Sequence, residues 1–154
     1  MHYYSYAMSI CLRYARTRET AEEILNDSFL KVFKSIKKYN SDYPFKSWLR
    51  RIIINTAIDH YRTTQSKQPE YKNINMEIIN QTKNKALDNL EIEDILHLLG
   101  KLSDTQRVVF NLYEMEGYHH KEIAEILSIT EVNSRTYLKR AKEALRILYN
   151  QYFS

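Results

Sequence analysis

Pro44–Arg62, with the sequence PFKSWLRRIIINTAIDHYR, carries the strongest helical pattern in the chain. Pro44 marks an entry, because proline cannot occupy a helix interior, and Ser47 can cap the helix that follows. Apolar side chains then recur at positions 48, 49, 52, 53 and 57, the spacing of one side of a helix. We therefore predict a helix over residues 47–63 with one side packed in a core.

A polar stripe accompanies this predicted helix. Its members recur at steps of three and four residues and so share a face: Arg51, Asn55, Asp59 and Arg62, with Lys46 and Arg50 beside them. The loop before the helix is rich in aromatic rings, those of Tyr39, Tyr43 and Phe45. Cations that hold phosphate, next to rings that stack on unpaired bases, suit single-stranded nucleic acid. The pattern leaves open an ordinary core helix whose Trp48 and tyrosines only pack.

Composition narrows the class of protein. A chain of 154 residues provides one domain or two small ones, and its net charge of +4 permits nucleic-acid binding without requiring it. Two glycines and two prolines favour long helices over an all-β fold. The single cysteine, Cys11, excludes an internal disulfide framework, and its apolar neighbours predict a place in the core. No apolar run has membrane-spanning length and no signal-peptide pattern opens the chain, so we expect a cytoplasmic protein without membrane insertion.

The first half predicts two further helices. Residues 3–16 show apolar four-residue steps, and Thr20 with Glu23 forms a capping box that opens a helix over residues 21–38. The expected inward set is Ala21, Ile24, Leu25, Phe29, Val32, Phe33 and Ile36. The opposite face carries charges and an exposed Leu30, which fits either a docking surface for a partner or a solvated face.

The second half reads as a helix-turn-helix domain after a polar linker over residues 65–89, within which a short helix at residues 76–79 can form. Expected helices cover residues 90–99, closed by Gly100, then a segment capped by Ser103 and Gln106 and ended by Gly117. A short helix over residues 119–128, a tight turn and a long helix to about residue 152 complete the pattern.

The final predicted helix has two stripes. Leu138, Ala141, Leu145 and Leu148 form the inward one, and Arg135, Lys139, Lys142 and Arg146 form the outward one. Concentrated positive charge in an otherwise acidic half fits a recognition helix that lies in the major groove of DNA. The alternative is a solvated basic helix that binds nothing.

Several motifs occur together in a characteristic order: AEEILNDSFLKVF at 21–33, FKSWLRRI at 45–52, NTAID at 55–59, LS at 102–103, GYHHKEIA at 117–124 and RTYLKRAKE at 135–143. With them the chain resembles bacterial RNA polymerase sigma factors of the extracytoplasmic-function (ECF) group in the sigma-70 family. The resemblance implies an all-α protein of two small helical domains, residues 1–64 and 90–154, joined by a flexible linker over 65–89. It implies a non-catalytic protein without metal or cofactor that binds core RNA polymerase and directs promoter recognition, melting and transcription initiation.

The resemblance also implies a role for each surface. Binding to the β′ clamp helices of the polymerase falls to Asn26, Asp27, Leu30 and Lys31. Reading and melting of the minus-ten element fall to Tyr39, Tyr43, Lys46, Trp48, Arg51, Asn55, Asp59 and Arg62. Contacts to the minus-thirty-five element fall to Asn133, Arg135, Thr136, Lys139, Arg140 and Lys142. The implied partners are core polymerase, through its β′ clamp helices and β flap, promoter DNA and an anti-sigma factor, with a monomer when free.

The chain departs from the family pattern in places. Asn26 and Asp27 stand where Gln-Glu is commoner, and His119 stands where a Ser or Thr cap is usual, so the helix it opens should start less firmly. The family usually has one or two more helix turns before the position of Met1, so either Met1 is a late start or the first helix is cut short.

Two rival readings follow from the same sequence. A two-domain helix-turn-helix repressor or activator would bind DNA without polymerase, and the aromatic loop with its helix weighs against it. An enzyme with a metal site at His119, His120, Glu122 and His60 is disfavoured. Adjacent histidines of a helix point about 100° apart and cannot both easily reach one ion.

Overall fold

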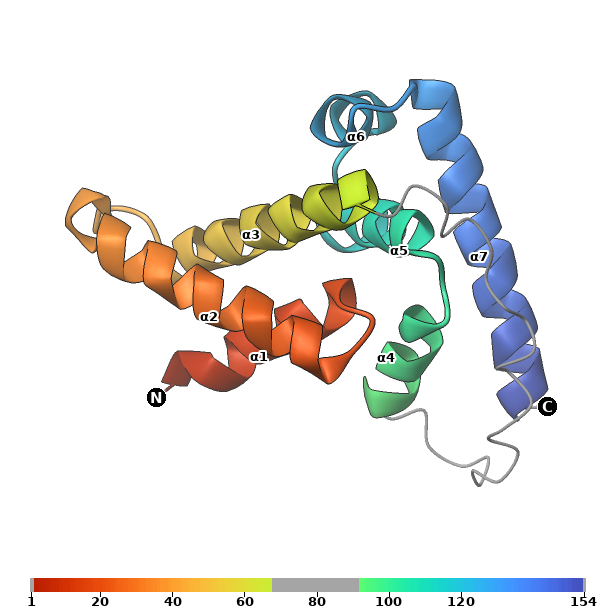
Figure 1. The fold of residues 1–154 in the computed structure, drawn as a ribbon, viewed down its shortest axis with the longest axis horizontal. Coiled ribbons are helices and arrows are strands. Elements are labelled where there is room, and N and C mark those ends of the chain that lie inside the picture. Colours follow the sequence, from red (N-terminus) through yellow and green to blue (C-terminus); the bar gives the residue numbers. More distant parts are fainter. Residues whose placement is uncertain (1, 68–91, 154) are drawn as a thin grey trace. The chain divides into compact units, whose positions relative to one another are not determined.

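The computed structural model describes residues 2–67 and 92–153, and within those two ranges every regular element is a helix. The chain divides into two compact units, residues 1–67 and 68–154 (Figure 1). The predicted all-α class with two helical bodies is confirmed. The predicted linker lies outside the described residues except for its start, which belongs to the last helix of the first body, and the short helix expected at 76–79 lies outside them as well. The predicted domain boundaries stay a prediction.

The first body is a bundle of α1 (His2–Tyr14), α2 (Arg18–Ser35) and α3 (Phe45–Lys67), each in contact with the other two (Figure 1). Ile10, Ile24, Leu49 and Ile53 are fully buried between the helices. Cys11 is buried too, as predicted, and this burial raises the pKa of its thiol to about 12. The core of the first body is therefore built by one side of each helix, which leaves the other side of α2 and α3 to solvent.

Helix α2 begins three residues before its predicted start. Thr17, not Thr20, is the N-cap: the Thr17 side chain accepts a hydrogen bond from the Thr20 amide at 3.2 Å. Starting at Arg18 adds backbone hydrogen bonds, beginning with Ala21 N to Thr17 O, and an Arg18–Glu22 ion pair at 3.4 Å. Both threonines are good caps, so the prediction chose the wrong one of two similar signals.

The ends of the other helices in this body also differ from expectation. The last three residues of the predicted 21–38 helix form a separate 3₁₀ turn, η1 (Ile36–Lys38). Helix α3 begins directly after Pro44, so Ser47 lies inside its first turn and does not cap it. Phe33 and Ile36 were expected in the core, yet Phe33 is 75% exposed and Ile36 45% exposed. Phe33 follows the buried Val32 by about 100° around the helix, which turns its ring away from α1 and α3.

The second body comprises α4 (Ile92–Gly100), α5 (Asp104–Phe110), the π-helical turn η3 (Asn111–Met115), α6 (His120–Leu127) and α7 (Glu131–Phe153). Helices α4, α5 and α6 all contact α7 (Figure 1). The predicted inward stripe of α7 is confirmed, with Leu138, Ala141 and Leu148 buried and Leu145 partly buried. The long helix α7 is thus the support on which this body is assembled.

Local signals fix the helix ends of the second body. The predicted capping box is present, because Ser103 Oγ accepts from Gln106 N at 3.2 Å and Gln106 Oε1 accepts from Ser103 N at 3.3 Å. Gly117 adopts the left-handed φ of +76° that ends the preceding helical segment. Ser128 does the same at φ +56°, and the Ile129 amide bonds back to Ala124 O at 3.0 Å to close α6.

Helices α6 and α7 form the predicted helix-turn-helix. The sequence did not single out Thr130, whose Oγ1 accepts from the Asn133 amide at 3.0 Å and caps α7. The turn between the helices is therefore fixed on one side by the left-handed Ser128 and on the other by a threonine cap. No helix within the two described ranges is long and apolar enough to cross a membrane.

The helix start at Thr17 gives a first prediction. Thr17→Ala should lower the free energy of unfolding of the first body by about 1 kcal/mol, because the Thr20 amide loses its acceptor, and Thr17→Ser should retain most of it. Urea unfolding followed by the fluorescence of Trp48, the single tryptophan, measures the change. The matched control is Thr20→Ala, and a larger loss there than at Thr17 would contradict this helix start.

Candidate functional site

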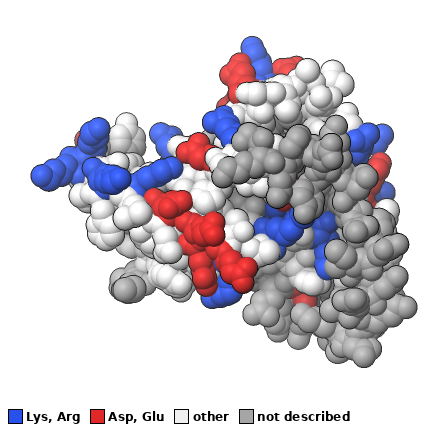
Figure 2. Space-filling model, in the orientation of Figure 1, with Lys and Arg blue, Asp and Glu red and all other residues white. Residues whose placement is uncertain are grey.

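The outer face of α2 combines exposed apolar side chains with a gradient of charge. Leu30 is 57% exposed and Phe33 is 75% exposed, although both lie on a helix whose other side is packed. Acidic residues occupy the N-terminal half of this helix, Glu19, Glu22, Glu23 and Asp27, and basic residues follow, Lys31, Lys34, Lys37 and Lys38. Figure 2 shows the corresponding red and blue atoms along α2. The predicted site residues Asn26, Asp27, Leu30 and Lys31 are all exposed on this helix, and Phe33 joins them, which the sequence reading had placed in the core.

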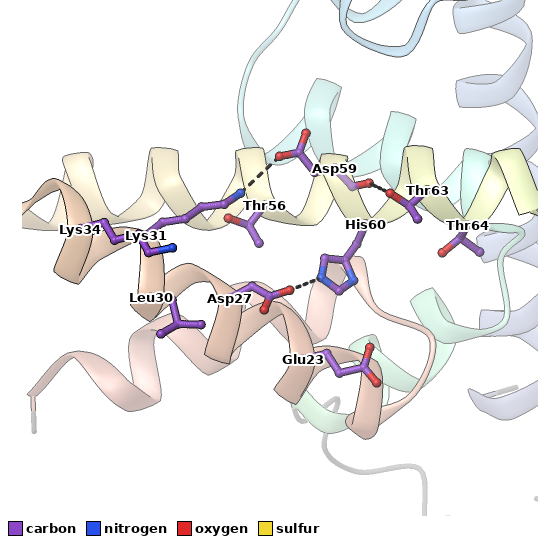
Figure 3. A pocket seen from close by; sticks show the side chains of 10 residues that line it. All are labelled: Glu23, Asp27, Leu30, Lys31, Lys34, Thr56, Asp59, His60, Thr63 and Thr64. Atoms are coloured by element: carbon purple, nitrogen blue, oxygen red, sulfur yellow. Dashed lines mark hydrogen bonds and ion pairs between the residues drawn. The ribbon is translucent and has the colours of Figure 1, made fainter.

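A groove of about 590 Å³ separates the exposed edges of α2 and α3. Its lining consists of Glu23, Asp27, Leu30, Lys31, Lys34, Thr56, Asp59, His60, Thr63 and Thr64 (Figure 3). Two contacts cross it: Lys31 Nζ lies 3.2 Å from Asp59 Oδ2, and His60 Nε2 lies 2.7 Å from Asp27 Oδ2. The sequence assigned Lys31 to one surface and Asp59 to another, whereas the structure pairs the two side chains directly.

The aromatic loop is mostly packed on itself. The ring of Tyr39 lies 5.6 Å from that of Phe45 and 5.0 Å from that of Trp48, and the Phe45 and Trp48 rings are 5.6 Å apart. These three residues are partly buried, and the Tyr39 hydroxyl donates to the backbone carbonyl of Tyr43. Among the rings of this fully described loop, Tyr43 alone is exposed, at 66%. Tyr39 and Trp48 thus pack on each other while staying partly exposed, and Tyr43 has the most exposed ring of the loop.

The polar stripe of α3 lies at the surface, as its spacing predicts. Arg51, Asn55, Asp59 and Arg62 are all exposed. Asp59 accepts contacts from Lys31 and, at 3.9 Å, from Arg62, so its carboxylate is shared between two cations. Lys46, at the start of the helix, has its Nζ 5.1 Å from the centre of the Tyr6 ring. Of the four stripe residues, Asp59 lines the groove, and Arg51, Asn55 and Arg62 lie outside it.

The predicted DNA-reading residues of α7 divide by their contacts. Asn133, Arg135, Lys139 and Arg140 are exposed, and Arg135 lies 3.5 Å from Glu131 of its own helix. Lys142 instead reaches back into its own body: its Nζ lies 2.6 Å from Glu114 Oε1 and 5.9 Å from the centre of the Tyr113 ring. Thr136 is partly buried, and its hydroxyl donates to Val132 O at 3.0 Å.

His120 joins the two helices of the helix-turn-helix. Its ring stacks on Tyr113 with 4.6 Å between centres, and its Nδ1 lies 2.8 Å from Oγ of the buried Ser134. Desolvation is the main cause that lowers the pKa of His120, followed by the nearby charge of Arg135. The sequence reading weighed this histidine only as a metal ligand. Among the described residues no group of three or more His, Cys, Asp or Glu is placed to hold a metal ion.

His119, expected to start α6 weakly, does occupy the N-cap position of that helix. The first turn gains support from Glu122, whose Oε1 accepts from the His119 amide at 3.3 Å. The acidic partner of a capping box is therefore present where the usual Ser or Thr is not.

Comparison with known proteins agrees with this architecture. Sigma-70 region 2 matches residues 1–67, and sigma-70 region 4 matches residues 92–145. The ECF sigma factor SigM of Bacillus subtilis is 25% identical over 141 residues, which cover 91% of this chain and 86% of that protein. The ECF sigma-E factor of Haemophilus influenzae is 26% identical, with coverage of 84% and 74%. The fold is also similar to that of the sigma factor RpoE of Bartonella quintana, solved in complex with the anti-sigma factor NepR, with a TM-score of 0.57 at 18% identity and coverage of 95% and 91%.

Two helical bodies, the second a helix-turn-helix, define a class of DNA-binding transcription proteins, and the match of region 2 to the whole first body separates this chain from simple repressors. The chain belongs to the sigma-70 family and is an ECF sigma factor, which directs RNA polymerase in promoter recognition and initiation. Proteins of this family are not enzymes, and their domains bind core polymerase and promoter DNA.

The environment of His120 predicts a pH-dependent stability. Because the folded-state pKa lies below the ordinary value of 6.5, the unfolded chain binds more protons between the two pKa values. The contribution of His120 to the free energy of unfolding is therefore complete above pH 6.5 and declines as the pH falls toward the folded-state pKa. Urea unfolding of the second body, followed by circular dichroism between pH 5 and 7.5, tests this.

The matched control for that experiment is the adjacent, exposed His119. His120→Gln should flatten the pH dependence of the urea midpoint, and His119→Gln should leave it in place. An unchanged slope in His120→Gln would show that the stacked, Ser134-bonded ring is not the titrating group.

Proposed function

We propose that this sigma factor divides its work among three surfaces: α2 for core polymerase, the aromatic loop with α3 for the opened minus-ten element, and α7 for the duplex minus-thirty-five element. Residues 1–64 and 90–154 would form the two functional domains, with 65–89 as the linker that lets each reach its own target. The observation that carries the proposal is the exposure of two large apolar side chains, Leu30 and Phe33, on the solvent side of α2.

Helix α2 has the properties of a docking face. A contiguous exposed apolar patch with a polar rim is typical of a protein interaction site. Leu30 and Phe33 provide the apolar centre, and Asn26 and Lys34 provide polar groups around it. The proposed partner is the pair of clamp helices of the polymerase β′ subunit, with Asp27 and Lys31 at the edge of the contact.

The loop and α3 suit an opened DNA strand. Tyr43 offers an exposed ring, and a base stacked on an aromatic side chain gains about 1–3 kcal/mol, which offsets the few kcal/mol that unstacking it costs. The exposed Arg51 and Asn55 lie further along α3, where they can contact phosphate or a base edge. The partly exposed rings of Tyr39 and Trp48, which pack on each other, extend this aromatic surface.

The second body supplies an anchor on paired DNA. Its exposed Asn133, Arg135, Lys139 and Arg140 lie on the first turns of α7, the part of a helix-turn-helix that enters the major groove. Tethering raises the effective concentration of each body at its own promoter element, so neither has to bind tightly alone.

Further partners follow from the same assignment. The β flap of the polymerase is the proposed contact of the second body, and an anti-sigma factor is a proposed regulator, as in the complex of the Bartonella quintana protein. We place the free protein in the cytoplasm as a monomer.

Core binding is tested by replacing the exposed apolar pair. Leu30→Ser and Phe33→Ser should each weaken association with core polymerase by about tenfold or more, the effect of losing an interface anchor worth 1.4 kcal/mol or more. Association is measured by fluorescence anisotropy of the labelled protein, and run-off transcription should fall in parallel. Tyr4→Ser removes another exposed large side chain, from α1, and serves as the control. Undiminished binding by both variants would remove α2 from the interface.

Strand capture is tested on a promoter template whose minus-ten region is already single-stranded. Tyr43→Ala should leave core association unchanged and weaken binding of the holoenzyme to this template by about fivefold or more, as expected for one lost stacking contact. Asn55→Ala should also leave core association unchanged and weaken template binding, through the loss of a polar contact to phosphate or a base edge. Tyr4→Ala is again the control, as an exposed tyrosine outside the proposed surface. Equal binding by wild type and Tyr43→Ala would contradict capture by this loop.

A further inference from the structure

Val132 is an exposed apolar residue at the start of the helix proposed to read DNA. Its side chain is 66% exposed in the first turn of α7. Ser134, Leu138 and Ala141 are buried and define the packed side of this helix. At about 100° per residue, Val132 lies roughly opposite the centre of that packed side. The outermost point of the first turn is therefore an aliphatic side chain and not one of the cations.

Thr136 continues the same surface one turn later. Residues four apart share a face of a helix, so Thr136 lies next to Val132. The Thr136 hydroxyl donates to Val132 O at 3.0 Å and is thereby used within the helix backbone. The hydroxyl proton is therefore occupied, and Thr136 has its methyl group and an acceptor oxygen left for an outside contact. Val132 and Thr136 together form an aliphatic strip, which we call the methyl patch.

Charged and polar side chains lie on both sides of the methyl patch. By helical angle, Arg135 and Lys139 fall on one side of it, and Asn133 and Arg140 fall on the other, and all four are exposed. A helix in the major groove brings its central line to the base edges and its flanks to the phosphates on either side. The charges flanking the patch thus match a duplex, and the patch lies where the base edges would be.

We propose that the methyl patch of Val132 and Thr136 reads the 5-methyl group of a thymine in the minus-thirty-five element. Thymine is the one DNA base with a methyl group in the major groove, and aliphatic side chains are its usual contact. A guanine at the same place would bring two acceptor atoms against methyl groups and a hydroxyl whose proton is already used, and leave those acceptors without a donor. The inference rests on the proposed function, since it requires α7 to lie in the major groove.

The experiment removes the proposed contact first from the DNA, by taking away the thymine methyl group, and then from the protein, by shortening the methyl patch. On a promoter from which the holoenzyme initiates, each thymine of the minus-thirty-five element is replaced singly by deoxyuridine, which lacks only the 5-methyl group. Wild-type holoenzyme should lose about fourfold in affinity at one position, the effect of exposing one methyl group. Val132→Ala and Thr136→Ser shorten the patch, and Thr136→Ser keeps the hydroxyl that bonds to the backbone.

For these variants, replacement of that thymine by deoxyuridine should cost less than twofold, because the protein side of the contact is already gone. Alanine is the better helix former, so Val132→Ala does not weaken α7. Lys139→Ala, which alters a flank of the patch, should weaken binding to thymine and deoxyuridine promoters by the same factor and reduce the salt dependence of binding.

The experiment distinguishes failure of the methyl contact from failure of α7 to bind the major groove. If no deoxyuridine replacement in the element affects affinity, or if Val132→Ala and Thr136→Ser retain full sensitivity to it, the methyl-patch inference is wrong and α7 can still bind the groove. If Arg135→Ala and Lys139→Ala also leave promoter affinity unchanged, the placement of α7 on DNA fails as well.

Discussion

Burial of one side of each long helix is the constraint on which every surface of this protein depends. Once Leu49 and Ile53 are fixed in the core of the first body, the helical repeat leaves Arg51 and Asn55 no position except the surface. The same holds for α7, where buried Leu138 and Ala141 determine which residues face outward. The binding surfaces are therefore consequences of core packing. A change in the core that rotated a helix would change which of its residues are exposed.

The sequence predicted this constraint well where the helices are long and periodic. The course of α3 and α7, the Ser103 capping box and the left-handed Gly117 all follow from local patterns and match the structure. Helix starts were harder, because Thr17 and Thr20 are both good caps and only the packed helix chooses between them. The exposure of Phe33 could not be predicted from the residue type, because a phenylalanine on a helix is usually buried in the core and only less often forms part of an interface.

The side-chain contacts within the candidate surfaces could not be predicted from the sequence. Lys31 and Asp59 are far apart in the chain, as are Lys142 and Glu114, and no local pattern pairs them. Exposed ion pairs of this kind stabilise a fold by at most about 1 kcal/mol. A phosphate can therefore replace the carboxylate at little cost, and the internal pairing of a lysine does not remove it from DNA binding. Stacking of Tyr39 on Trp48 was equally hidden, because it depends on how the loop closes onto α3.

Burial of Cys11 has a practical consequence for studying the motions of the first body. The thiol of Cys11, with a pKa near 12, carries almost no thiolate at neutral pH. It is buried within the three-helix bundle, so alkylating reagents can reach it only when the helices separate. Because the chain has no other cysteine, the rate of alkylation reports opening at a single, known place, and it follows the population of the open state when reclosing is faster than the reagent. The same measurement made on the polymerase-bound form would show how far binding to the polymerase suppresses local opening of the bundle.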